Sequence, residues 1–186
     1  MPKSSNSNID SHTLKLAKMA LMLAVAVICS FIHFPILPAA PFLEFEVSDI
    51  PILISAFVFG PLPGLVIGLV SVLLHDLMMG PASGPYGMIM HAIAVTAYVL
   101  VAGAIYTGFK TKKWGLIALI IGGICMTAAM IPANLIITPL FMGVPVAVVK
   151  GMLVPVLIPF NLIKMAICTA VVFLIYKRLS PFLHKW

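Results

Sequence analysis

Six apolar stretches, each separated from the next by prolines, glycines or charges, decide what this chain can fold into. We expect helices over residues 13–33, 48–60, 63–79, 86–107, 114–137 and 149–176. A membrane-spanning helix needs about 20 apolar residues, and all the stretches but the second come near or exceed that length. The mean hydropathy of +1.20 and a charged fraction of 9% also belong to an integral membrane protein. The sequence therefore predicts an all-α membrane protein with six transmembrane helices.

The termini of the chain are expected to be short tails around one membrane domain. Residues 1–12 are polar and are predicted to be a disordered tail, residues 13–178 the six-helix domain, and residues 179–186 a C-terminal tail. No segment remains for a separate soluble catalytic domain.

The basic residues predict the orientation of the domain in the membrane. With six spans both termini lie on one side, and that side receives nine of the 11 Lys and Arg residues: Lys3, Lys15, Lys18, Lys110, Lys112, Lys113, Lys177, Arg178 and Lys185. The positive-inside rule then places both termini in the cytoplasm of a multi-pass cell-membrane protein. Because the positive charge is explained in this way, the net charge of +6 does not indicate nucleic-acid binding.

Local signals refine individual helices. Ser48 and Asp49 are good N-cap residues for the second helix, which is short for a full span and is expected to start in the loop or to be shielded by its neighbours. Gly60, Gly64 and Gly68 recur every four residues and predict a smooth face for close helix contact. In the last helix, Pro155 and Pro159 predict a kink near its start. The segment 34–45 holds three prolines and is predicted to be an ordered loop at a membrane face.

Lys164 is the polar residue with the highest cost, because a charge inside a membrane helix costs roughly 2.5–3.5 kcal/mol on insertion scales. Asn161 lies three positions earlier on the same helix face, and Asn134 follows Pro132 in the fifth helix. Under the predicted topology all three lie in the outer half of the membrane. An Asn amide offers a donor and an acceptor while Lys offers donors alone, which suits a planar heterocycle with an amide-like edge.

The same three residues have a second interpretation, as polar contacts that hold helices together. Lys164 would then pair with Asp49, Glu46 or Asp76, and the residues alone weigh the two interpretations evenly. Phe42, Phe45 and Tyr86 are expected near the same face as Lys164 and favour an apolar pocket with few polar anchors. Each aromatic taken singly is typical of an interfacial belt.

Catalytic signatures are absent from the sequence. It has no phosphate-binding GxxxxGK[ST] loop, no HExxH and no GxSxG. His75, Asp76 and His91 have the ligand types of a metal site without its spacing. The three cysteines lie in apolar runs without paired spacing, as small packing residues do.

An alanine stripe marks the first helix. Ala17, Ala20 and Ala24 fall on one face and permit close approach of another helix, either inside this chain or from a partner.

Together these features resemble the substrate-binding S component of energy-coupling factor (ECF) vitamin transporters, and within it the riboflavin-specific group. The segments that carry the resemblance are Phe42-Leu43-Glu44-Phe45-Glu46-Val47-Ser48-Asp49-Ile50-Pro51, Phe59-Gly60-Pro61, Ser83-Gly84-Pro85-Tyr86-Gly87, Asn134 with Thr138-Pro139, and Pro159-Phe160-Asn161-Leu162-Ile163-Lys164. Together they reach from the loop after the first helix into the sixth helix.

The resemblance implies a transport subunit without enzymatic activity, cofactor or metal. It implies riboflavin as the transported ligand, with Asn134, Asn161 and Lys164 holding the flavin ring and the loop from Phe42 to Glu46 covering it. We include Phe45, Glu46, Asp49 and Tyr86 among the expected binding residues. The implied partners are membrane lipid, a transmembrane coupling subunit that docks on Ala17, Ala20 and Ala24, and two ATPase subunits.

Other interpretations remain open on sequence alone. The family loop often carries a basic or amide residue beside its acid, whereas Glu44 and Glu46 are both acidic, and carboxylates would repel a phosphorylated ligand such as FMN. An S component for thiamine or folate is the nearest alternative. A small membrane enzyme using His75, Asp76 and His91 and a purely structural membrane protein are more distant ones.

Overall fold

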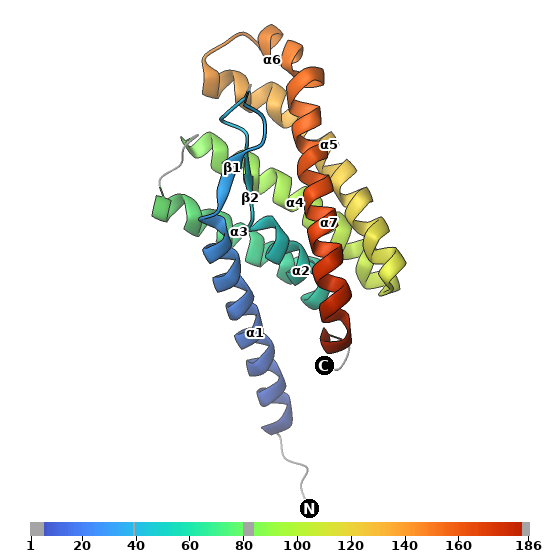
Figure 1. The fold of residues 1–186 in the computed structure, drawn as a ribbon. Coiled ribbons are helices and arrows are strands. Elements are labelled where there is room, and N and C mark those ends of the chain that lie inside the picture. Colours follow the sequence, from blue (N-terminus) through green and yellow to red (C-terminus); the bar gives the residue numbers. More distant parts are fainter. Residues whose placement is uncertain (1–5, 39, 80–83, 184–186) are drawn as a thin grey trace, which may run out of the picture.

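A computed structural model of the chain describes residues 6–38, 40–79 and 84–183, and most of these residues are helical (Figure 1). The helices are α1 (Asn6–Ser30), α2 (Asp49–Phe59), α3 (Pro61–Met79), α4 (Gly84–Phe109), α5 (Lys112–Met142), α6 (Val146–Met152) and α7 (Ile158–Leu183). A π-helical turn, η1 (Leu153–Leu157), joins α6 to α7, so the three form one interrupted helix. Within the described residues this gives six helices, as the sequence predicts.

Five of these helical units are long and apolar enough to cross a membrane within the described part of the chain, and α2 is the short exception. With 11 residues, α2 is about half the length that a span requires. Its residues 49–57 are buried, and it packs against α1, α3, α4 and α7. The neighbouring helices therefore shield α2 from lipid, which was one of the two possibilities left by its length.

Several helices extend beyond their predicted ends. α1 begins at Asn6, inside the segment predicted as a tail, and α7 continues to Leu183. α5 runs past Pro139 to Met142 and ends where Gly143 adopts a left-handed conformation with φ of 65°. A glycine at this position is a common helix C-cap, because it lacks the Cβ that opposes positive φ.

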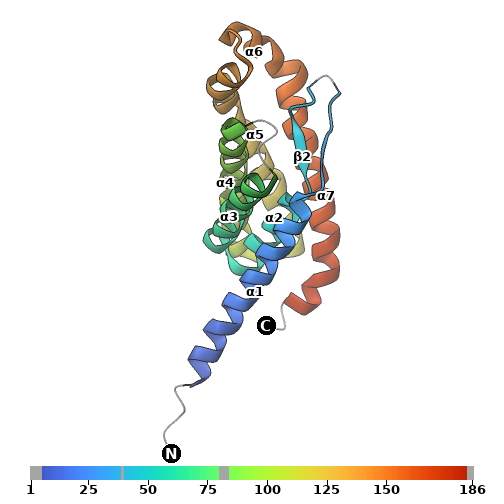
Figure 2. The same cartoon turned by 90° about the vertical axis from the view of Figure 1, so that its left-hand side faces the viewer.

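The segment predicted as a loop forms a small hairpin. β1 (His33–Pro35) pairs antiparallel with β2 (Glu44–Glu46), with Phe34 opposite Phe45. Pro35 sits at the end of β1, where a strand tolerates a residue without an N–H. The hairpin lies beside the upper part of α7 in both views, above the short helix α2 (Figures 1 and 2).

The predicted kink in the last helix is confirmed and takes the form of the π-helical turn. Pro155 has no N–H to donate, and the N–H of Ile158 bonds to the carbonyl of Leu153, five residues earlier. After this turn α7 presents one buried face, formed by Phe160, Asn161, Lys164, Cys168, Val172 and Tyr176. The turn therefore sets the direction in which Asn161 and Lys164 point.

Glycines allow the short helix α2 and the start of α3 to pack tightly. A Cβ built on Gly64 would lie 2.5 Å from the Cα of Ala56, and one built on Gly103 of α4 would lie 2.9 Å from the Cα of Pro61. Gly60 has a different role from the one predicted, because it turns the chain between α2 and α3 with φ of 100°.

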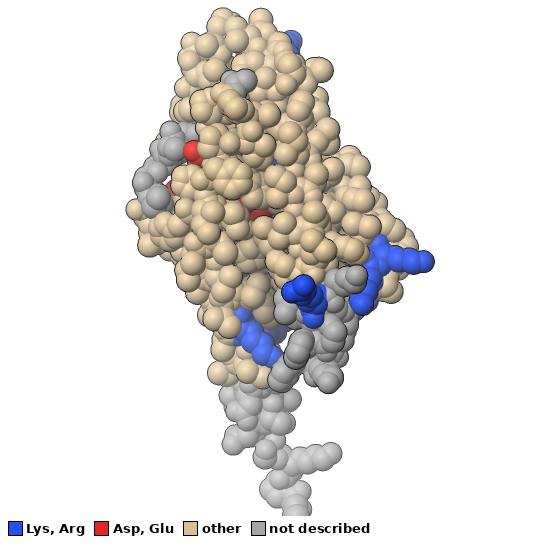
Figure 3. Space-filling view, viewed as in Figure 1, with Lys and Arg blue, Asp and Glu red and all other residues tan. Residues whose placement is uncertain are grey.

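Charge is distributed unequally along the bundle. Figure 3 shows Lys and Arg gathered mainly toward the lower end, with little blue or red on the broad surface above it. The helices that form this surface are apolar. α1 starts, α7 ends and α4 meets α5 at that end, whereas α6 lies at the opposite end (Figure 1). A basic end and an apolar girdle fit a helical bundle embedded in a bilayer.

Candidate ligand-binding site

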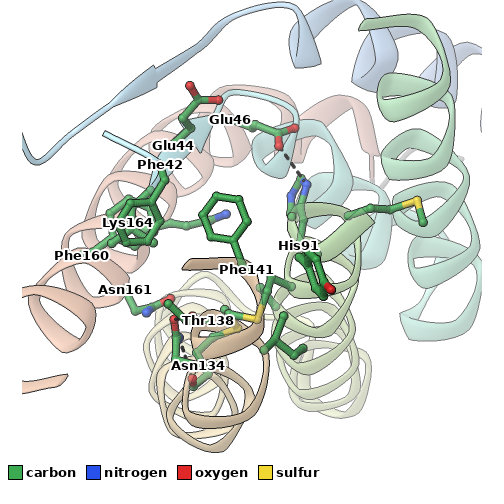
Figure 4. A pocket seen from close by; sticks show the side chains of 18 of the residues that line it. Phe42, Glu44, Glu46, His91, Asn134, Thr138, Phe141, Phe160, Asn161 and Lys164 are labelled. Atoms are coloured by element: carbon green, nitrogen blue, oxygen red, sulfur yellow. Dashed lines mark hydrogen bonds and ion pairs between the residues drawn. The ribbon is translucent and has the colours of Figure 1, made fainter. Parts of the chain in front are cut away.

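A cavity of about 440 Å³ lies between the hairpin, α3, α4, α5 and α7. This volume is within the range of about 300–1,000 Å³ that is usual for small-molecule sites. Amides gather on one side of it and carboxylates on the other, with Phe141 between them (Figure 4).

The amide side comes from α5 and α7. Asn134 Nδ2 donates to the carbonyl of Met130 at 2.7 Å, and Asn134 Oδ1 accepts from Thr138 Oγ1 at 3.0 Å. Asn161 Nδ2 donates to the carbonyl of Leu157 at 2.8 Å. These bonds fix both buried amides and leave each a second N–H for a ligand, together with the Asn161 carbonyl oxygen.

Aromatic rings frame the cavity. The ring of Phe141 lies 6.0 Å from that of Phe42 in the hairpin loop and 6.4 Å from that of Tyr86 at the start of α4. These distances are typical of interacting aromatic pairs, and all three residues line the cavity. The arrangement leaves space for a flat apolar ligand between rings and amides.

Lys164 is buried and already paired. Its Nζ lies 2.7 Å from Asp49 Oδ2, and the two side chains are 7% and 6% exposed. Lys164 lines the cavity, while Asp49 stands behind it at the start of α2. The pocket and the helix-joining interpretations of Lys164 are therefore compatible, because one of its three N–H donors can serve Asp49 while others face the cavity.

The ion pair continues into a chain of buried charges. His91 Nε2 lies 3.1 Å from Asp49 Oδ1. His91 Nδ1 lies 3.0 Å from Glu46 Oε1, a contact that Figure 4 shows. Ser48 Oγ donates to Glu46 Oε2 at 3.2 Å. Burial raises the pKa of Glu46, but the charge of His91 and its hydrogen bond lower it by more, so the pKa stays below its ordinary value. The chain links α7, α2, α4 and β2 in that order.

The hairpin side of the cavity is acidic. His33 Nδ1 lies 2.9 Å from Glu44 Oε2, and His75 Nδ1 lies 3.0 Å from Ser30 Oγ. Asp76 also lines this side, and its Oδ2 is a buried atom without a hydrogen-bond partner among the described residues. Among the described residues of the cavity wall, Glu44, Glu46 and Asp76 therefore outnumber Lys164, and Asp49 pairs with that Lys.

Most of the predicted binding residues meet at this cavity. Its wall includes Asn134, Asn161, Lys164, Glu46 and Tyr86. The other two predicted residues do not reach the wall. Phe45 points away and packs on Phe34 with ring centroids 5.6 Å apart, because side chains alternate along a strand, and Asp49 acts from behind Lys164.

The alanine stripe lies elsewhere. Ala17, Ala20 and Ala24 are exposed on α1. Among the described residues, the main contacts of α1 are with α2 and α3, and they are made by its opposite side. Leu21 and Ile28, which are 65% and 67% exposed, share this open side of the helix.

Sequence reasoning missed Phe141 and did not include His91 among the binding residues. It considered His91 as part of a metal or enzyme site and, preferably, as a residue that hydrogen-bonds a loop at the outer membrane boundary. The helix predicted over residues 114–137 ends before Pro139 and leaves Phe141 in the following loop. Two signals would have found it: Gly143 followed by Pro145 marks a later helix end, and Asn134, Thr138 and Phe141 are spaced four and three residues apart on one face. His75, Asp76 and His91 form no group that could hold a metal among the described residues.

The comparisons with known proteins agree with this architecture. The sequence profile described as "ECF transporter, substrate-specific component" matches residues 14–176. The chain therefore belongs to the substrate-specific components of ECF transporters, which are multi-pass membrane proteins and not enzymes.

Named relatives cover nearly the whole chain. The riboflavin transporter RibU of Staphylococcus aureus (strain TCH60) is 34% identical over 92% of this chain and 93% of its own length. The riboflavin transporter FmnP of Bacillus subtilis (strain 168) is 26% identical over 92% of this chain and 94% of its own length. A solved structure described as the S component of a bacterial ECF transporter superposes with a TM-score of 0.80 at 33% identity, covering 92% of this chain and 98% of that one.

Proposed function

We propose that this chain is the riboflavin-binding S component of an ECF transporter. The observation that carries the proposal is the cavity itself, with two buried amides and Lys164 on one side and aromatic rings around it. The ring system of riboflavin is flat and has one edge of alternating carbonyl and N–H groups, and its polyol chain carries several hydroxyls. The riboflavin transporters among its relatives support the same ligand.

The proposed pose follows from the chemistry of the two sides. The ring edge lies toward Asn134, Asn161 and Lys164, where donors and an acceptor are available. The polyol lies toward the hairpin, where Glu44 and Asp76 can accept its hydroxyl hydrogens. A phosphorylated flavin fits less well, because a phosphate would meet carboxylates and the paired Lys164 offers little compensating charge.

The proposed partners are membrane lipid, a transmembrane coupling subunit and two ATPase subunits. The exposed face with Ala17, Ala20 and Ala24 is the proposed contact with the coupling subunit, because small side chains let a second helix approach closely. The proposed orientation keeps both termini in the cytoplasm, as the basic residues indicate.

Fluorescence titration of the purified protein tests the site. Asn134→Ala and Asn161→Ala are each expected to weaken riboflavin binding about tenfold or more, the effect of losing one or two buried hydrogen bonds. Leu162→Ala is the matched control, because Leu162 adjoins Asn161 but is 40% exposed on the outside of α7. FMN is expected to bind more weakly than riboflavin to the wild-type protein.

Unchanged affinity in both asparagine variants would place the ligand outside this cavity. Tighter binding of thiamine or folate than of riboflavin would favour an S component for another vitamin.

A further inference from the structure

His91 occupies a position that a neutral imidazole cannot satisfy. Its two ring nitrogens lie 3.0 Å from Glu46 Oε1 and 3.1 Å from Asp49 Oδ1. An ionised carboxylate only accepts hydrogen bonds, and a neutral imidazole has a single N–H. With one proton, His91 would direct a lone pair at an oxygen of an ionised carboxylate, so two ionised carboxylates at these distances favour the doubly protonated ring.

The two carboxylates belong to parts of the protein with different roles. Asp49 is fixed at the start of α2 and holds Lys164 at 2.7 Å. Glu46 belongs to strand β2 of the hairpin that borders the cavity, where Glu44 and Glu46 are both wall residues. His91 on α4 is thus the side chain that ties the hairpin to the buried ion pair.

Charged groups on the neighbouring elements affect the contacts of His91 with Glu46 and Asp49. Glu46 of β2, Asp49 of α2 and, through Asp49, Lys164 of α7 face His91 directly. Asp76 of α3 interacts electrostatically with both His91 and Glu46, and with its neighbour His75. Three carboxylates and one ammonium group therefore surround His91.

We propose that His91 is a positioning residue that, when doubly protonated, fastens strand β2 over the cavity to the Asp49–Lys164 pair, so that loss of its proton speeds ligand release. Whichever nitrogen loses the proton, one of the two contacts changes from attraction to repulsion. The inference rests on the proposed function for the identity of the ligand. It adds a pH-dependent contact that fixes the hairpin.

The experiment is to measure the rate of riboflavin release from the purified protein between about pH 5 and about pH 9.5. This range contains the interval of about pH 5–8 in which an unperturbed histidine titrates, and extends above it. In the wild-type protein the rate should rise roughly tenfold with pH, the effect of losing one charge-assisted hydrogen bond. His91→Gln should release riboflavin fast at every pH.

Two further variants sharpen the test. Glu46→Gln removes one carboxylate, so a neutral His91 suffices, and the pH dependence should disappear while the helical bundle stays intact. If His91→Gln does not fold, the comparison of Glu46→Gln with the wild-type protein still tests the proposal. His12→Gln, at an exposed position of α1, should keep the wild-type pH profile. A flat wild-type profile, or a rise that persists in His91→Gln, would overturn the inference.

A ligand-free measurement separates this inference from the proposed function. Absence of riboflavin binding in the wild-type protein would defeat the proposed function alone. Hydrogen exchange of residues 44–46, corrected for its intrinsic pH dependence, should still show loss of protection with rising pH in wild type and no such loss in Glu46→Gln. Equal protection profiles in the two proteins would contradict the role of His91.

Discussion

Lys164 shows how one residue serves stability and binding together. Its charge is tolerated in an apolar helix because Asp49 neutralises it at 2.7 Å, and the same side chain forms part of the cavity wall. Sequence reasoning identified Lys164 as exceptional and named Asp49 among three possible partners. The sequence does not select between these partners, because the pairing depends on how α2 packs against α7. No sequence feature within either helix determines that packing.

Removal of Lys164 should destabilise the protein as well as weaken binding. Lys164→Met removes one of the two cations beside Asp49, so Asp49, His91 and Glu46 are left with one uncompensated buried negative charge. Breaking a buried pair typically costs about 3–5 kcal/mol. Adding Asp49→Asn removes the uncompensated charge and keeps an acceptor for His91. Thermal unfolding should therefore show a large loss in the single variant and a partial recovery in the double variant, with riboflavin affinity restored in neither. A single variant as stable as wild type would mean that the pair is not formed.

At the level of elements, helices with local signals were predictable and long-range pairings were not. α2 begins at Asp49, where the sequence predicts it, but Ser48 forms no side-chain capping hydrogen bond, and its Oγ donates to Glu46 instead. The irregular start of the last helix falls at Pro155 and Pro159, as predicted. The sequence does not predict the hairpin, because each strand is only three residues long and the loop between the two strands contains prolines. Its position depends on side chains such as Glu46, whose partner His91 lies 45 residues away in sequence.

Helix packing offers a direct test at this scale. Gly64→Ala should destabilise the fold by about 1–3 kcal/mol or more, because the added methyl group would collide with the backbone of α2 at Ala56. Gly151→Ala in α6 is the matched control, since no atom lies within 4 Å of its added Cβ, and it should be neutral or slightly stabilising. Equal melting temperatures for the two variants would contradict the close packing of α2 and α3.

At the scale of the whole molecule, the arrangement predicts a defined orientation in the membrane. In a background without the three native cysteines, Val148→Cys in α6 and Lys112→Cys at the start of α5 sit at opposite ends of the bundle (Figure 1). A membrane-impermeant thiol reagent added to intact cells should label the first and not the second. The reverse pattern would place the cavity on the cytoplasmic side.

Docking on the coupling subunit is also a property of the whole molecule. Ala20→Trp should abolish co-purification with the coupling subunit and leave riboflavin binding unchanged, because α1 contributes its alanine face to neither the core nor the cavity. Leu174→Trp, at a position of α7 that is 63% exposed, controls for a bulky residue in the membrane. Normal co-purification of the Ala20 variant would exclude this face as the contact.

The central claim is that the cavity between the hairpin, α4, α5 and α7 binds riboflavin. The most direct test is titration of the purified, ligand-free wild-type protein with riboflavin, thiamine and folate, followed by flavin fluorescence or calorimetry. We expect saturable binding of one riboflavin per chain, with weak or no binding of thiamine and folate. Absence of saturable riboflavin binding, or tighter binding of thiamine or folate, would contradict the central claim.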